Sequence, residues 1–387
     1  MQEQYTILVV DDEPDLQPLI LQRMRRDIRA GRYHFVFAQN GIEALQKLSQ
    51  DDGIDMVLSD INMPQMDGLT LLEQIPKVDP NVRSVIISAY GDMKNIRTAM
   101  NRGAFDFVTK PIDFEDLKVT IGRTLRHMAE WREALLARDK LVVLQNELSV
   151  ARQMQQSILP TQFPQSPGYS VYGKMEAARN VGGDFYEVLP FDDGQIGLAI
   201  ADVSDKGVPA ALFMMASRTL LKSIAMGQSD PGQVLGELNE LLEEDNEEGM
   251  FVTLVYGVYD PSTRELTYAN GGHNSPVVVH RDGTSELLPL TEGIALGVQP
   301  MLRYAQNTVQ LSPGDRVVFY TDGVTEAMDG DGEQFGLERL SKLFESPAAP
   351  QDPESANLLV FDAVNTFVGD TPQSDDITCL TLSCSEA

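Results

Sequence analysis

One stretch of the chain, from Ile112 to Leu159, contains no proline and a single glycine, Gly122, and it is bounded by Pro111 and Pro160. Proline is the residue that a helix interior tolerates least, so about 48 residues without one predict a long helix. At 1.5 Å per residue this helix would extend about 72 Å. We therefore expect two folded regions joined by a helix.

Apolar residues in this stretch recur at alternating steps of three and four, the spacing of a coiled-coil seam. The first series is Phe114, Leu117, Ile121, Met128, Trp131, Leu135 and Val142, and the second, offset by one residue, is Leu141, Leu144, Leu148, Ala151 and Ile158. We expect Phe114–Leu125 to pack on its own domain and Arg138–Ile158 to form a homodimer seam, with a register slip near Arg138. The alternative is that each half of the helix packs on its own domain.

Before this stretch, short β-branched runs alternate with helical patterns. The expected strands are Ile7–Val10, Phe35–Ala38, Met56–Ser59, Val85–Ser88 and Phe107–Thr109, with helices near residues 14–26, 42–49, 68–76, 92–102 and 113–127. Buried strands separated by helices are typical of βαβ crossovers. The pattern predicts an α/β fold with a doubly wound parallel sheet of five strands.

After the stretch, the pattern changes to short alternating runs divided by Gly, Pro, Asp and Asn turns. The expected strands are Gly197–Val203, Thr253–Tyr259, Glu265–Asn270, Pro276–His280, Arg316–Tyr320 and Ile377–Leu382, and Pro209–Met226 and Gly232–Glu243 are expected helices. This pattern indicates an α+β fold, an antiparallel β-sandwich flanked by helices.

The overall charge narrows the possible functions. Thirty Lys+Arg against 58 Asp+Glu give a formal net charge of −28, which repels nucleic acid and anionic lipid, so we expect neither as a partner. The two cysteines, Cys379 and Cys384, lie too near the end of the sequence to form a disulfide framework. No apolar run approaches the length of a membrane span and no signal-peptide pattern is present, so we expect a cytoplasmic protein.

A first acidic cluster is predicted at the edge of the parallel sheet. Asp11 and Asp12 follow the first strand and Asp60 ends the third, while Ser88 and Lys110 end the fourth and fifth. The carboxyl ends of parallel strands share one edge, so these side chains should meet there. Three carboxylates suit Mg²⁺, and Asp60 can attack a phosphoryl donor while Ser88 and Lys110 contact the new phosphate oxygens. The plainer alternative is a set of solvated acids at strand ends.

The motifs ILVVDDEPD, MVLSDINMPQMDGL, VIISAYGD and AFDFVTKP, in this order, resemble those of response-regulator receiver domains. The resemblance implies that Asp60 is the phosphoacceptor for a cognate histidine kinase. It also implies Mg²⁺ ligands from Asp11, Asp12, Asp60 and the backbone carbonyl of Asn62. Ser88, Phe107 and Lys110 are the implied switch residues.

A second acidic cluster is predicted in the C-terminal region. Four separate motifs place acids beside tight turns at the ends of β-type runs: Asp184 in ARNVGGDFYEV, Asp202 in AIADVSDKGVPAAL, Asp322 in VFYTDGVTEAM and the pair Asp375 and Asp376 in QSDDITCL. Carboxylates without Cys or His select Mg²⁺ or Mn²⁺ over zinc, and two such ions can activate water for phosphate-ester hydrolysis. Acids before glycines also cap turns, which would explain any one of these positions but not all of them.

These motifs resemble the metal-dependent PP2C-type serine/threonine phosphatases, in particular the bacterial SpoIIE/RsbU-like branch. The resemblance implies that Asp202 bridges two Mn²⁺ or Mg²⁺ ions, that the Val203 carbonyl joins the metal site, and that Asp202 and Asp322 are catalytic. Asp184, Asp322 and one of the final pair complete the implied metal site, with Asp375 favoured over Asp376. Arg179 lies where related enzymes carry a phosphate-binding arginine.

Together, the two resemblances predict a two-component response regulator whose output is a serine/threonine protein phosphatase. The expected domains are a receiver at 1–125, a helical linker of coiled-coil type at 126–160 and a phosphatase at 161–387. The implied substrate is a phosphorylated STAS-type anti-sigma-factor antagonist in a partner-switching pathway. The alternative is a non-catalytic adaptor that uses a phosphatase-like domain to bind a sigma-factor regulator.

Overall fold

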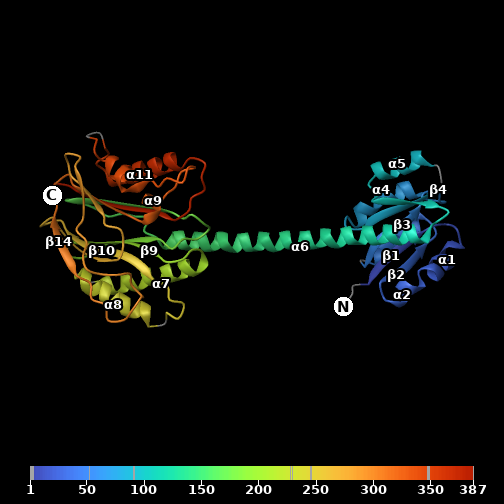
Figure 1. Ribbon diagram of the computed structural model, residues 1–387, viewed down its shortest axis with the longest axis horizontal. Helices are drawn as coiled ribbons and strands as arrows, with labels where there is room; N and C mark the ends of the chain where they lie inside the picture. Colours follow the sequence, from blue (N-terminus) through green and yellow to red (C-terminus); the bar gives the residue numbers. More distant parts are fainter. Residues whose placement is uncertain are drawn as a thin grey trace. The chain divides into compact units, whose positions relative to one another are not determined.

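The structure is a computed structural model that describes residues 4–51, 53–89, 92–226, 228, 230–244, 246–346 and 349–386 (Figure 1). Tyr90 and Gly91 of the VIISAYGD motif lie outside the described residues. The chain divides into two compact units, Met1–Val143 and Leu144–Ala387, and helix α6 (Phe114–Ile158) contributes residues to both.

The N-terminal unit is built on five parallel strands in the order β2-β1-β3-β4-β5. The strands are β1 (Tyr5–Val10), β2 (Tyr33–Ala38), β3 (Ile54–Asp60), β4 (Arg83–Ala89) and β5 (Asp106–Lys110). This confirms the predicted doubly wound sheet. The strand order reverses between β1 and β3, so their carboxyl ends lie side by side at the position where such sheets bind ligands.

Helices cover both faces of this sheet, because successive side chains of a strand point to opposite faces. Ile7 and Val9 of β1 pack with α1 and α6, whereas Leu8 and Val10 pack with α3 and α4. The helices are α1 (Leu16–Arg23), α2 (Arg25–Arg29), α3 (Gly41–Gln50), α4 (Gly68–Val78) and α5 (Met93–Asn101). The single helix expected at 14–26 is wrong: the chain forms two short helices that meet at Met24, where φ is −92° and ψ is 6°.

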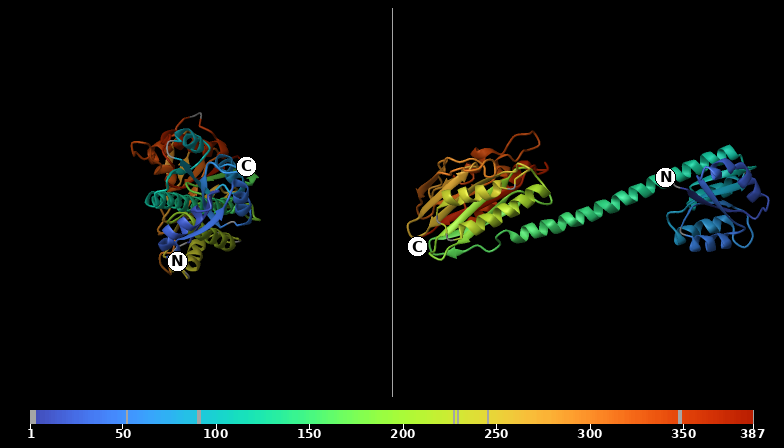
Figure 2. Two further views of the ribbon diagram at one scale, coloured as in Figure 1. Left: turned by 90° about the vertical axis from the view of Figure 1, so that its right-hand side faces the viewer. Right: turned by 90° about the horizontal axis from the view of Figure 1, so that it is seen from below.

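Helix α6 runs without a break, as the proline-free stretch predicts (Figure 2). Its first turns bury Leu117, Ile121 and Leu125 in the N-terminal core, which confirms the expected packing of that part. The middle of the helix exposes apolar side chains, including Leu141 at 59% and Leu144 at 51%. Burial resumes at Gln155, inside the C-terminal unit.

The C-terminal unit contains two antiparallel sheets, as predicted, with strand orders β14-β11-β10-β9-β8 and β13-β12-β15-β16-β7-β6. The first sheet comprises β8 (Phe185–Pro190), β9 (Ile196–Val203), β10 (Val252–Asp260), β11 (Glu265–Gly271) and β14 (Gln306–Gln310). The second comprises β6 (Gln165–Ser166), β7 (Tyr169–Glu176), β12 (Val277–Val279), β13 (Ser285–Leu287), β15 (Arg316–Tyr320) and β16 (Ile377–Cys384).

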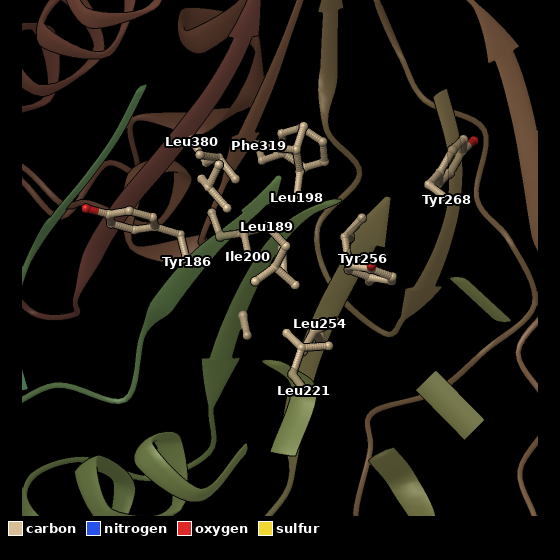
Figure 3. Packing of buried hydrophobic residues seen from close by; sticks show 14 of the residues in the cluster. Tyr186, Leu189, Leu198, Ile200, Leu221, Leu254, Tyr256, Tyr268, Phe319 and Leu380 are labelled. Atoms are coloured by element: carbon tan, nitrogen blue, oxygen red, sulfur yellow. The ribbon is translucent and has the colours of Figure 1, made fainter. Parts of the chain in front are cut away.

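Helices cover the outer faces of this sandwich (Figure 1). They are α7 (Val208–Ala225), α8 (Pro231–Glu243), α9 (Asp322–Thr325), α10 (Gly336–Lys342) and α11 (Pro353–Val368). Between the sheets, Leu198 and Ile200 of β9 pack in one buried cluster with Phe319 of β15 and Leu380 of β16 (Figure 3). This core fixes the ends of β9, β15 and β16 relative to one another.

Helix α7 corrects one expectation from the sequence. Within the described residues, its length of 18 residues and its apolar composition are those of a candidate membrane span. However, Ala210, Met214 and Leu221 belong to the buried core of the C-terminal unit. Because one apolar face is buried in this way, we interpret α7 as a core helix.

Candidate functional site

The first acidic cluster forms where β1 and β3 end. Asp11 and Asp60 are buried, Asp12 is exposed, and one carboxylate oxygen from each lies within 4.8 Å of the other two. The fold therefore brings the three predicted carboxylates together. Their hard oxygen atoms and close spacing fit a single Mg²⁺ ion.

Lys110, at the end of β5, supplies the positive charge of this cluster. Its Nζ donates to Asp11 and Asp60, each at 3.1 Å, and to Glu13 at 2.7 Å. Burial lowers the pKa of Lys110, but the hydrogen bonds to Glu13, Asp60 and Asp11 outweigh it and raise the pKa above its ordinary value. The pKa of Asp11 is raised, mainly by burial. Glu13 was not predicted, although its place two residues after Asp11 in DDEPD is a signal that sequence reasoning could have used.

The remaining predicted receiver residues lie on the neighbouring strands. Ser88 is buried on β4, and its hydroxyl has no hydrogen-bond partner among the described residues. It stands one position beyond Ile87, the residue that pairs with Asp60 across the ladder. Phe107 on β5 is 36% exposed, and Asn62 is exposed two residues after Asp60. An unpartnered hydroxyl on the strand next to Asp60 is suited to donate a hydrogen bond to an oxygen of a phosphoryl group on that carboxylate.

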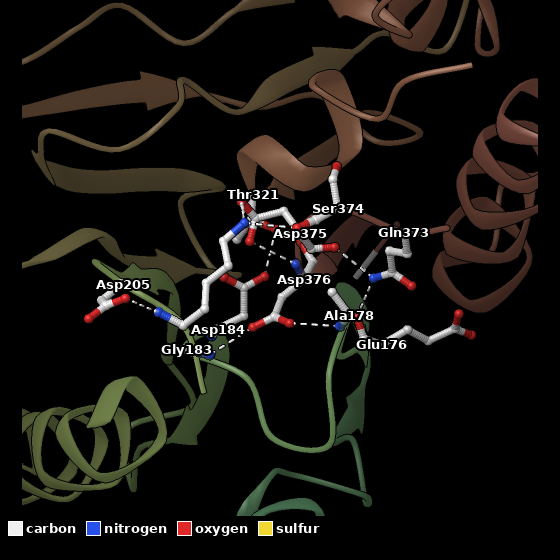
Figure 4. Close-up of polar contacts among 11 residues, drawn as sticks. Glu176, Ala178, Gly183, Asp184, Asp205, Thr321, Gln373, Ser374, Asp375 and Asp376 are labelled. Atoms are coloured by element: carbon white, nitrogen blue, oxygen red, sulfur yellow. Dashed lines mark hydrogen bonds and ion pairs between the residues drawn. The ribbon is translucent and has the colours of Figure 1, made fainter. Parts of the chain in front are cut away.

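The second acidic cluster gathers at the ends of β8, β9, β15 and β16. Asp184 directly precedes β8 and Asp202 is the next-to-last residue of β9, while Asp322 begins α9 and Asp375 precedes β16. Asp184 is almost completely buried, and its Oδ2 accepts a hydrogen bond from the hydroxyl of Thr321 at 2.7 Å (Figure 4). The same oxygen accepts from the hydroxyl of Thr378 at 2.6 Å. Neither threonine was predicted, although each accompanies a recognised motif, TDG or DDIT.

The carboxylates of this cluster lie close enough to repel one another, and they are buried or partly buried. Burial raises the pKa of Asp202 to about 7, and the charges of Asp322 and Asp375 act in the same direction. Burial, with the charges of Asp202 and Asp376, raises the pKa of Asp184 well above its ordinary value. The pKa of Asp322 is also raised, mainly by burial and by the charge of Asp375. A cluster that resists ionisation in this way gains stability when cations bind.

The two neighbouring acids before β16 have different surroundings. Asp376 accepts from the backbone N–H of Ala178 at 2.8 Å through Oδ1 and from that of Gly183 at 2.7 Å through Oδ2. Asp375 instead forms an ion pair with Lys206 at 2.7 Å. Both oxygens of Asp376 are thus occupied by backbone N–H groups, whereas the charge of Asp375 acts on Asp202 and Asp322. This difference favours Asp375 as the metal ligand.

Glycine is required where these turns meet. A Cβ at Gly182 would lie 2.3 Å from Oδ2 of Asp376, and a Cβ at Gly323 would lie 1.9 Å from the backbone oxygen of Asp376. The carbonyl oxygen of Val203 would lie 2.9 Å from a Cβ at Gly183, so the predicted carbonyl ligand does face the turn that carries Asp184. Arg179 is exposed in the connection between β7 and β8.

Two residues near the cluster have structural partners. His273 is buried, with Nδ1 2.7 Å from the Thr253 hydroxyl and Nε2 3.2 Å from the Tyr320 carbonyl oxygen. Burial lowers the pKa of His273 to about 4, so its ring is neutral near pH 7. The hydroxyl of Ser204 accepts from the N–H of Phe251 at 2.9 Å. Both side chains are therefore engaged in holding the fold.

The donor set of the second cluster suits hard divalent cations. It consists of aspartate oxygens and a backbone carbonyl, which are ligands that Mg²⁺ and Mn²⁺ prefer. Among the described residues, the only group of three acids with ligand atoms within 4.8 Å of one another is the receiver trio. The more widely spaced C-terminal acids fit a site shared by two ions better than a site for one.

The fold and the two sites define a class: a response regulator with a receiver domain followed by a PP2C-type output domain. Family models match both parts, the response regulator receiver domain at residues 7–122 and Stage II sporulation protein E (SpoIIE) at residues 192–385. The chain belongs to the SpoIIE family of PP2C-type phosphatase domains, with an N-terminal receiver domain.

Individual relatives agree with this assignment. Protein IcfG of Synechocystis sp. is 29% identical over 68% of this chain and 45% of its own length, and phosphoserine phosphatase RsbU of Bacillus subtilis is 32% identical over 52% of this chain and 60% of its own length. The chain thus spans about half the length of these curated relatives. The SiaA-PP2C domain of Pseudomonas aeruginosa superposes with a TM-score of 0.54 at 25% identity, covering 63% of this chain and 98% of that domain.

Proposed function

We propose that the chain is a two-component response regulator whose output is a metal-dependent phosphoserine/phosphothreonine protein phosphatase. The proposed domains are the receiver at 1–125, the helical linker at 126–160 and the phosphatase at 161–387. The substrate that we propose is a phosphorylated STAS-type anti-sigma-factor antagonist, in keeping with the similarity to phosphoserine phosphatase RsbU. The protein acts in the cytoplasm without a nucleic acid or membrane partner.

One observation carries the proposal of catalysis. Asp184 is buried, and the hydrogen bonds that its carboxylate accepts come from hydroxyls rather than from a cation; burial and the charges of neighbouring acids raise its pKa. Buried acids of this kind destabilise a fold unless a bound charge compensates them, so their presence indicates a binding function. A non-catalytic adaptor has no need for this arrangement.

The proposed ligands of two Mn²⁺ or Mg²⁺ ions are Asp184, Asp202, Asp322, Asp375 and the Val203 carbonyl. When bound, the ions would activate a water molecule for attack on the phosphate ester and neutralise the charge on its oxygens. Asp202 and Asp322 are the acids that we propose as catalytic, while Asp376 positions the Gly183–Asp184 turn. Arg179, which is exposed, would bind the substrate phosphate.

In the receiver, we propose that a cognate histidine kinase phosphorylates Asp60. Asp11, Asp12, Asp60 and the Asn62 carbonyl would hold Mg²⁺, and Ser88, Phe107 and Lys110 would respond to the phosphoryl group. The exposed apolar side chains in the middle of α6, such as Leu141 and Leu144, support a homodimer through the linker.

Catalysis is tested by hydrolysis of p-nitrophenyl phosphate and of a phosphorylated STAS protein with Mn²⁺ present. We expect Asp202→Asn and Asp322→Asn each to lower the rate by at least about 100-fold, because each removes a negative ligand at the reacting centre. The matched control is Asp193→Asn, which changes an exposed acid in the turn between β8 and β9 and should act as wild type. Equal and negligible rates for all four proteins would favour the adaptor instead.

Receiver control is tested separately with Asp60→Ala. We expect this variant to lose the response of the phosphatase to beryllofluoride while it retains wild-type affinity for Mn²⁺ in the C-terminal domain. An unchanged response would show that control does not pass through Asp60.

A further inference from the structure

We propose that Lys206, in the turn between β9 and α7, binds the phosphate group of the substrate at the second acidic cluster. The contact is a charge-assisted hydrogen bond from Nζ to a phosphate oxygen. The inference rests on the proposed function, because it adds a substrate-binding residue to the same phosphatase site. The sequence motif that contains Lys206 gave this residue no role.

Lys206 lies beside two of the proposed metal ligands, on the open side of the cluster. Its Nζ donates to Oδ2 of Asp375 at 2.7 Å and to the Ser374 carbonyl oxygen at 2.8 Å. Burial is the main cause that raises the pKa of Asp322, and the charge of Lys206 acts in the opposite direction. The side chains of Lys206 and Asp375 are 40% and 32% exposed, whereas Asp184 is almost completely buried. A phosphate group that enters from solvent therefore meets Lys206 before it reaches the buried acids.

The ammonium group of Lys206 has a donor available for a ligand. A lysine Nζ carries three N–H donors. In the part of the chain that the structure describes, Ser374 and Asp375 take two of them, and the third has no partner. Because the side chain is partly exposed, this third donor can reach an oxygen of a bound phosphate while both existing contacts remain.

The charge around Lys206 favours a role in binding an anion. The chain carries a formal net charge of −28, and a phosphate ester that approaches the cluster is itself negatively charged. Among the described residues, Lys206 is the one cation that forms an ion pair with an acid of this cluster. Arg179, which we propose for the same ligand, is exposed and forms no ion pair with these acids. Lys206 is thus the cation best placed to offset the repulsion.

The backbone around Lys206 is held in a conformation that an ordinary turn does not need. Asp205 has φ of 71° and Gly207 has φ of 85°, so left-handed residues stand on both sides of Lys206. Ser204 fixes the start of the turn, because its N–H donates to the Phe251 carbonyl oxygen and its hydroxyl accepts from the Phe251 N–H, each at 2.9 Å. A left-handed residue other than glycine is strained, and such strain is found mainly at functional sites.

The ion pair with Asp375 does not account for this strained turn. A pair whose two side chains are partly exposed contributes little to stability, and less than the strain of one left-handed aspartate costs. The turn directs Lys206 toward the cluster at a net cost to the fold. A contact that forms only when the substrate is bound explains why the lysine is held there.

The test measures binding of inorganic phosphate to the full-length chain by calorimetry at saturating Mg²⁺, so that no turnover is involved. The variants are Lys206→Met, which removes the charge, and Lys206→Arg, which retains it. The matched control is Lys222→Met, the same change at an exposed lysine in the last turn of α7. Mg²⁺ affinity, thermal unfolding and the KM and kcat for p-nitrophenyl phosphate are measured on the same proteins.

We expect Lys206→Met to raise the Kd for inorganic phosphate by about tenfold, and to raise KM by a similar factor with little change in kcat. Mg²⁺ should bind at least as tightly as in wild type, because Asp375 has lost a competing cation. Weaker phosphate binding then cannot result from loss of the metal. Lys206→Arg should stay within about threefold of wild type, and Lys222→Met should match wild type.

Three results would overturn the inference. They are wild-type phosphate affinity in Lys206→Met, equal losses in Lys206→Met and Lys222→Met, and a wild-type protein that binds no inorganic phosphate with Mg²⁺ present. Lys206→Gln, a polar side chain without charge, provides the same test if the methionine variant does not fold.

Failure of this inference is distinguishable from failure of the proposed function. A chain that binds phosphate through Lys206 but hydrolyses no phosphate ester would refute the phosphatase and leave the phosphate contact intact. A chain that hydrolyses the ester, and whose Lys206→Met variant keeps wild-type phosphate affinity and KM, would refute the contact alone.

Discussion

The two acidic clusters of this chain use similar carboxylates but differ in the positive charge beside them. In the receiver, Lys110 donates to Asp11, Glu13 and Asp60. In the phosphatase domain, Lys206 forms its one ion pair among the described residues with Asp375, at the more exposed side of the cluster. The hydrogen bonds of the buried Asp184 come from threonine hydroxyls.

The difference indicates how each site depends on metal. In the receiver, Lys110 balances the carboxylates, so the ends of β1, β3 and β5 can assemble without a bound metal ion. The phosphatase cluster holds its negative charge without an equivalent cation, and the raised pKa of Asp202 and of Asp184 reflects that imbalance. Divalent ions should therefore contribute more to the stability of the second site than to that of the first.

Of the changes that test this comparison, Lys110→Met should cause the largest loss of stability, in the receiver domain. Its removal leaves Asp11 and Asp60 buried together without their cation, and breaking a buried pair in this way costs about 3 to 5 kcal/mol. Calorimetry of the full chain should show the loss in the receiver transition, with partial recovery when Mg²⁺ is added. A receiver transition that does not move would mean that Lys110 does not balance the cluster. Lys118→Met, which removes an exposed pair with Glu115, is the control.

A smaller change in stability is expected when the pH is raised on the metal-free phosphatase domain. Burial raises the pKa of Asp202 to about 7 in the folded domain. The protonated side chain therefore stabilises the fold fully at a pH below the pKa that Asp202 has in the unfolded chain. This stabilisation is lost as the pH rises through about 7. Relative to Asp202→Asn, which does not titrate, wild type should lose about 2 kcal/mol between about pH 5.5 and about pH 7. Thermal unfolding in chelator measures the difference between the two proteins.

Mn²⁺ provides the control for this pH effect, because bound cations stabilise the ionised carboxylates. With Mn²⁺ present, the destabilisation of wild type on raising the pH should disappear. A difference between wild type and Asp202→Asn that stays constant across the pH range would contradict the imbalance that distinguishes the two clusters.

The smallest effect is expected from Lys206→Met. The side chains of Lys206 and Asp375 are 40% and 32% exposed, and a pair with that exposure contributes about 0 to 1 kcal/mol. The metal-free domain should therefore unfold within a few degrees of wild type, and Mn²⁺ should bind slightly more tightly because Asp375 has lost a competing cation. Loss of stability comparable to that of Lys110→Met would show that the two clusters are balanced in the same way.

Sequence patterns predicted the receiver sheet well, since its strands are continuous apolar runs. The C-terminal domain was harder to predict. Strand β7 was missed, although the alternation of buried and partly buried residues in Tyr169–Glu176 is a strand signal. Helix α11 was also missed, although Asp352 accepts from the Ser355 N–H and Pro353 occupies the first turn, a recognisable helix start.

The final pair of acids shows what local sequence leaves open. Asp375 and Asp376 are adjacent in QSDDITCL, and the sequence motif alone placed both among the candidate ligands. The structure separates them because Asp376 reaches the backbone of Ala178 and Gly183, almost 200 positions earlier in the chain, whereas Asp375 meets Lys206. Gln155 is a similar case, because its side chain donates to the carbonyl oxygen of Gly182, which is 27 positions away in sequence.

The sequence by itself determined the order of the domains, the long helix between them and the acids that end the strands, because strand periodicity, turn residues and the lack of proline act over a few neighbouring positions. Tertiary structure alone decided which acids share a cation. Lys110 meets Asp11 across 99 positions and Asp60 across 50. Such encounters follow from the packing of strand ends, and no local pattern encodes the electrostatic balance that results.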